Sequence, residues 1–178
     1  MKKINISVLT VALFAVCFAG CNYESPLVVE NSVPVDAAIL GSWETIPDEA
    51  KPSEDKYEAL VLKFSDTEYS IQYPRQDKDS LYFRGYPIKV GGKTYIQIQL
   101  IGSEAGPVKD ADRKYDVLSY TVSADTLVIS TLNTKIVDKT ISRTEGLLKA
   151  FLENKDTPEL FVNTVKFSKV PAAKVDEN

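Results

Sequence analysis

From Ala38 onward, the chain consists mainly of segments in which apolar and polar residues alternate, and each segment is bounded by turn residues. Successive side chains of a β-strand point to opposite faces of a sheet, so this alternation indicates strands with one buried face. No sustained helical period appears before residue 142. The sequence therefore predicts an antiparallel all-β domain.

Two pairs of these segments form predicted hairpins with four-residue loops at 65–68 and 123–126. The register matters, because a slip of one residue turns every apolar side chain to the other face. The first loop pairs Leu62 with Ile71, and the second pairs Val122 with Leu127. In both pairings one face is apolar. The aromatic residues predicted to face the interior are Phe64, Tyr69, Tyr73 and Tyr120.

A third hairpin, between these two in the chain, is predicted to turn at Gly91 and Gly92, which accept the positive φ of a two-residue loop. Val90 then lies opposite Lys93, and Phe83 faces the interior. The alternate positions Tyr82, Arg84 and Tyr86 face outward. This stripe is either a set of cross-strand pairs that stabilises the sheet or a candidate surface for contact with a partner.

One helix is predicted near the C-terminus. Ser142 and Glu145 have the spacing of a capping box, and Asn154 ends the run. Its apolar residues recur on one face; they are Leu147, Leu148, Phe151 and Leu152. Around these elements we expect a first strand near 38–46, a short strand at 135–141 and a last strand near 160–170.

Gly41-Ser42-Trp43 on the first strand, followed by hairpins, a late helix and a closing strand, resembles the lipocalins and their lipocalin-like bacterial relatives. The resemblance covers about residues 37–170 as topology and implies an antiparallel up-and-down barrel of about 8–9 strands in a domain at 37–172, with a tail at 173–178. It implies that Trp43 lies across the closed floor of the barrel. Arg143 loosely matches the basic residue that packs against this Trp in the family.

The N-terminus has the pattern of a secretory signal peptide, with Lys2 and Lys3 before an apolar run at 4–18. The residues Phe18-Ala19-Gly20-Cys21 resemble a bacterial lipobox. The resemblance implies removal of residues 1–20 and acylation of Cys21 with chains such as palmitate. Residues 21–36 have no clean period, so we interpret them as an extended lipidated tether. Asn22, where an Asp would resemble an inner-membrane signal, favours the outer membrane facing the periplasm.

Composition excludes several kinds of chemistry. The chain has no His, and its one Met is the initiator, while cleavage and acylation would leave no free thiol. The ligands preferred by zinc, copper and haem are therefore absent, and a His-based triad is impossible. We expect no metal, no cofactor and no enzymatic activity. The formal net charge of −4 argues against nucleic acid as a partner.

Two classes of function remain open. In the first, the lipid-anchored barrel holds a small apolar molecule, since eight strands leave an interior just wide enough for side chains or one ligand. In the second, the barrel is filled, and the protein is a structural or interaction lipoprotein of the envelope. The expected partners are the membrane, through the lipid anchor, and either an apolar ligand or an envelope protein.

Overall fold

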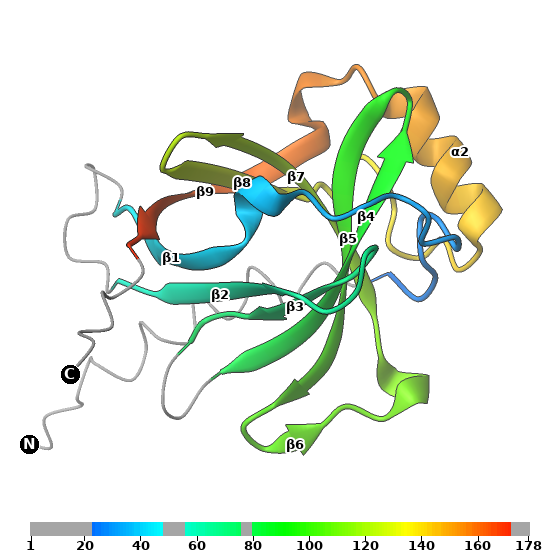
Figure 1. Ribbon diagram of the computed structural model, residues 1–178. Coiled ribbons are helices and arrows are strands. Elements are labelled where there is room, and N and C mark those ends of the chain that lie inside the picture. Colours follow the sequence, from blue (N-terminus) through cyan, green and yellow to red (C-terminus); the bar gives the residue numbers. More distant parts are fainter. Residues whose placement is uncertain (1–22, 48–55, 76–79, 172–178) are drawn as a thin grey trace, which may run out of the picture.

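The strands pair with one another in a closed ring (Figure 1). The computed structural model describes residues 23–47, 56–75 and 80–171. Within these residues, eight strands form the ring, because β1 pairs with both β2 and β9 and β4 also pairs with β5. The prediction of an antiparallel up-and-down barrel is confirmed. The ring strands are β1 (Gly41–Thr45), β2 (Glu58–Lys63), β3 (Tyr69–Gln72), β4 (Leu81–Val90), β5 (Lys93–Ser103), β7 (Tyr115–Ser123), β8 (Thr126–Leu132) and β9 (Phe161–Val170).

Short elements complete the chain. The 3₁₀ turn η1 (Ala37–Ile39) precedes β1, while β6 (Gly106–Pro107) and η2 (Asp110–Asp112) lie between β5 and β7. The helix α2 (Thr144–Asn154) and the turn η3 (Pro158–Leu160) lie between β8 and β9. The segment 135–141 is not the short strand that we predicted. It forms turns instead, in which the Ile136 and Val137 amides donate to the Asn133 carbonyl.

Two of the three predicted registers are confirmed. Val90 lies opposite Lys93 across the turn at Gly91 and Gly92, which both have positive φ. Val122 lies opposite Leu127, as predicted, and the strands extend one pair further to a tight turn at 124–125. In each hairpin the turn chemistry and the alternation favour the same register, so the local sequence suffices to specify it.

The register predicted for the β2–β3 hairpin is wrong by one residue. Val61, and not Leu62, lies opposite Ile71. The amides of Phe64 and Ser65 both donate to the Glu68 carbonyl, which lengthens the loop by one residue. Both alternating sets of β2 contain apolar residues, so the pattern could not decide between them. As a result Leu62 is 50% exposed, and Phe64, predicted to lie inside, is 58% exposed.

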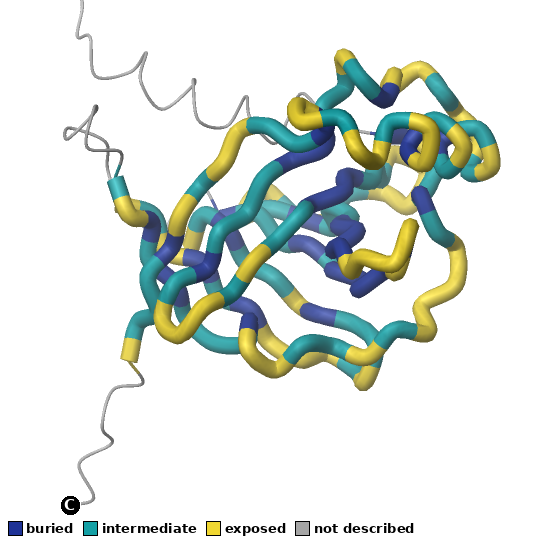
Figure 2. Tube along the Cα trace, turned by 90° about the horizontal axis from the view of Figure 1, so that it is seen from above, coloured by how far each residue is buried: buried dark blue, intermediate teal, exposed yellow. Residues whose placement is uncertain are grey.

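The barrel has two apolar cores, one inside the ring and one outside it. The outer core lies where α2 covers outward-facing residues of β4, β5 and β7. Figure 1 shows α2 beside the end of the β4–β5 hairpin at which the chain turns. Tyr95 of β5 packs edge-on against Phe151 of α2, with ring centroids 5.2 Å apart. Buried positions gather toward the middle of the molecule, while the turns are exposed (Figure 2).

Residues 23–28, which we call the N-terminal strap, also belong to the outer core. Tyr23 and Leu27 are each only 2% exposed. Backbone hydrogen bonds of 2.8 and 2.9 Å join Tyr23 to Tyr115 of β7, and the Tyr23 hydroxyl donates to the Val137 carbonyl. The prediction of an extended tether is therefore wrong for this segment, in which Tyr23 and Leu27 are buried in the fold. Cys21 and Asn22 lie outside the described residues.

Candidate functional site

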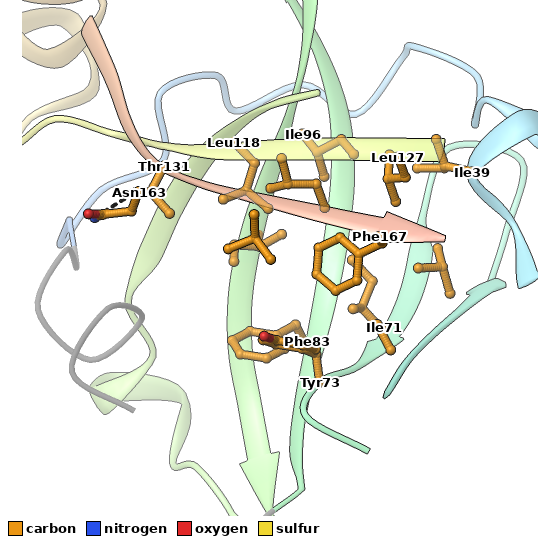
Figure 3. Close-up of a pocket in the computed structure, with 15 residues that line it drawn as sticks. Ile39, Ile71, Tyr73, Phe83, Ile96, Leu118, Leu127, Thr131, Asn163 and Phe167 are labelled. Atoms are coloured by element: carbon orange, nitrogen blue, oxygen red, sulfur yellow. Dashed lines mark hydrogen bonds between the residues drawn. The ribbon is translucent and has the colours of Figure 1, made fainter. Parts of the chain in front are cut away.

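The barrel encloses an apolar cavity of about 60 Å³ (Figure 3). It exists because inward-facing positions on seven strands supply its walls, and most of these side chains are aliphatic or aromatic. Tyr73, Thr131 and Asn163 contribute the polar groups of the lining. The lining residues are Ile39, Ala59, Val61, Ile71, Tyr73, Phe83, Ile96, Ile98, Leu118, Leu127, Ile129, Thr131, Asn163, Val165 and Phe167.

The size of this cavity limits what it holds. A single water molecule requires roughly 10–15 Å³, and an engineered apolar cavity of about 150 Å³ binds benzene. The cavity is therefore large enough for a short apolar group, whereas a complete aromatic ring would require its walls to move.

Polar groups gather at one end of the cavity, where a β-bulge interrupts the β8–β9 pairing. The side-chain amide of Asn163 donates to the Thr131 hydroxyl at 3.1 Å, and that hydroxyl donates to the Val162 carbonyl at 3.2 Å. Asn163 has a φ of 54° and is exposed although it lines the cavity. Asn163 therefore both lines the cavity and contacts solvent.

Trp43 belongs to the inner core and is fully buried. Its indole N–H donates to the Ile39 carbonyl at 2.9 Å, which ties β1 to η1. The Lys169 ammonium lies 5.1 Å from the centre of the Trp43 ring, within the range of a cation–π contact. The basic residue against Trp43 is thus Lys169, whereas Arg143 stands at the N-cap of α2 without a side-chain capping bond. The predicted Ser142 cap is not formed either.

Tyr69 and Tyr120 are inner-core residues whose hydroxyls bind Asp36. The Tyr69 oxygen accepts from the Asp36 amide, and the Tyr120 hydroxyl donates to the Asp36 carboxylate at 3.3 Å. Burial raises the pKa of Tyr69 to about 12. Of the predicted interior residues, Tyr73 and Phe83 line the cavity, whereas Trp43, Tyr69 and Tyr120 pack in the same core without lining it.

The predicted outward stripe is not a free surface. Tyr86 is only 7% exposed, so its assignment as a surface contact is wrong. Arg84 lies over the Phe64 ring at 4.5 Å and 3.7 Å from the Glu68 carboxylate. The Tyr82 hydroxyl donates to Glu104, a bond that raises the pKa of Tyr82. These contacts fit the interpretation in which the stripe stabilises the sheet.

Sequence reasoning missed Asp116 of β7, which is 3% exposed. The alternation of the sequence could have found it. The confirmed register of the β7–β8 hairpin places Leu118 inward, and residue 116, two positions earlier, lies on the same face. Asp116 accordingly lies opposite the cavity-lining Ile98. Burial raises the pKa of Asp116 well above its usual range, and the one backbone bond that opposes this, from the Val117 amide, is not enough to reverse it.

Within residues 23–47, 56–75 and 80–171, no cluster of three or more acidic, His or Cys side chains is arranged to hold a metal ion. The same part of the chain contains no helix that is long and apolar enough to cross a membrane. No protein-family model, curated protein or solved structure matches this chain.

Proposed function

We propose that this protein is a lipid-anchored barrel of the bacterial cell envelope that binds a small hydrophobic ligand. The observation that carries the proposal is the cavity, which is walled by apolar side chains and has the exposed Asn163 among its lining residues. Ligand sites are concave and mostly apolar, with a few polar groups that orient the ligand. Thr131 and Asn163 are the polar residues at one end of the lining, and the rest of the wall is almost wholly apolar. The small volume favours a ligand that inserts a short apolar part.

The anchoring half of the proposal depends on the lipobox-like residues that end at Cys21. Only Asn22 separates Cys21 from Tyr23, the first residue of the N-terminal strap. Two residues of extended chain span at most ~7 Å. A lipid on Cys21 would therefore hold the barrel close to the bilayer, whereas an extended tether over 21–36 would allow a reach of roughly 50 Å.

The ligand is tested with the mature chain carrying Cys21→Ser, which is purified, denatured and analysed by mass spectrometry for released small molecules. We expect a reproducible apolar compound. Ile129→Phe, which adds bulk to the cavity wall, should reduce the recovered amount by about tenfold. Val128→Phe, at the next residue and on the opposite face of β8, should leave it unchanged.

Failure to recover any compound, together with no binding of added apolar probes, would favour the alternative of a filled barrel that acts through its surface. Equal recovery from both Phe variants would show that the compound binds outside the cavity.

A further inference from the structure

Asp116 contains an unusual atom. Among the described residues, its Oδ2 is the one buried side-chain nitrogen or oxygen that lacks a hydrogen-bond partner. The other carboxyl oxygen, Oδ1, accepts from the Val117 amide at 2.8 Å. Buried polar groups in folded proteins nearly always have partners, because an unpaired one keeps the full cost of losing its water. Oδ2 is therefore an exception among the buried polar atoms of the described residues.

Asp116 lies beside residues that line the cavity. Asp116 lies two residues from Leu118 on the same face of β7 and opposite Ile98 of β5, and both of these residues line the cavity. The neighbouring Val117 belongs to the outer core, so the two residues face opposite sides of the sheet. Asp116 is not itself one of the lining residues; it is the next inward-facing position of β7 beyond Leu118, beside the cavity wall.

The environment determines the form of this carboxyl group. No ion pair is formed by Asp116, and the Val117 amide is the one donor that its side chain receives within the described residues. Burial without a counter-charge favours the protonated form. A protonated carboxyl has one O–H to donate, and with Oδ1 occupied by the Val117 amide, this hydrogen belongs on Oδ2. The protonated Oδ2 is therefore a hydrogen-bond donor without an acceptor among the described residues.

We propose that Asp116 is the residue that selects the ligand of the cavity, by donating a hydrogen bond to an oxygen of an uncharged molecule with a short apolar body. Ketones, esters, ethers and alcohols belong to this class. A cationic amine fits less well, because both ions would have to leave water for an apolar site. This inference depends on the proposed ligand-binding function and adds the chemical class of the ligand.

The test uses two probes of nearly equal shape, 2-butanone and 2-methyl-1-butene, both with fewer heavy atoms than benzene, in which a carbonyl oxygen is exchanged for a methylene group. Binding to the mature chain carrying Cys21→Ser is measured from the NMR signals of the Ile98 and Leu118 methyl groups. The ratio of the two affinities is compared between this protein and two further variants, Asp116→Asn and Asp116→Leu. The Asn amide can still donate, whereas Leu cannot.

We expect Asp116→Leu to lower the preference for the ketone by about tenfold, the effect of one hydrogen bond, and Asp116→Asn to retain most of it. An unchanged ratio in Asp116→Leu would overturn the role of Asp116 while leaving the cavity as a binding site. If neither probe shifts the methyl signals of the protein that keeps Asp116, both the inference and the proposed function fail.

Discussion

At the scale of single residues, the buried Asp116 couples folding to pH. Its pKa is raised in the folded protein, while in the unfolded chain it is near the ordinary value of ~3.9. The folded state therefore binds this proton more tightly. The favourable contribution of Asp116 is fully present below pH ~3.9 and is lost as pH rises toward the folded pKa.

Asp116→Asn removes this titration and keeps nearly the same shape. We expect the difference in unfolding free energy, variant minus unsubstituted protein, to increase as pH rises from 4 to 8, so that the variant is the more stable protein at pH 8. Urea titrations followed by the fluorescence of Trp43, the single Trp, measure this difference. A difference that stays constant over this range would contradict a buried, unpaired carboxyl group.

At the scale of elements, the attachment of the N-terminal strap depends on Gln97. This β5 residue is 2% exposed and faces away from the cavity. Its Oε1 accepts from the Leu27 amide at 2.7 Å and from the Val28 amide at 3.2 Å, and its Nε2 donates to the Val28 carbonyl at 3.1 Å. One side chain thus supplies the partners that a neighbouring strand would otherwise provide to an extended segment.

Gln97→Leu should therefore destabilise the protein by ~2–4 kcal/mol, because it leaves several buried backbone groups unpaired. It should also make the chain near residues 28–34 easier to cleave in limited proteolysis. Gln99→Leu is the matched control, since Gln99 lies on the same face of β5 and is only partly buried. Equal effects of the two substitutions on stability and cleavage would mean that Gln97 does not fasten the strap.

At the scale of the whole molecule, the strap determines how an acylated protein would meet the membrane. We expect Cys21→Ser to move the protein from the membrane fraction to the soluble fraction. Cys17→Ser should leave it in the membrane fraction after a high-salt wash, because Cys17 lies within the predicted signal peptide and the lipobox-like Cys is intact. Retention of Cys21→Ser in washed membranes would refute the lipid anchor.

Several features of the protein could be predicted from local sequence. Alternation and turn residues indicated an antiparallel all-β domain, the registers of the hairpins that turn at 91–92 and 124–125, and the inward positions of Tyr73 and Phe83. These predictions succeed because hairpins join neighbouring segments, so each strand and its partner lie within about 20 residues of each other in the chain. The apolar face of α2 was equally visible, because helical periodicity is a local property.

Other features were decided only by contacts between distant segments. Tyr23 is buried because Tyr115 and Val137 provide its partners, and no pattern within residues 21–36 reveals this. Phe64 is exposed because packing against the rest of the barrel selects the register of β2. The sequence could not select it, since β2 has apolar residues on both faces. Asp116 shows the same limit: its place on an inward face followed from alternation, but its missing partner depends on the side chains that strands far away in the chain bring around it.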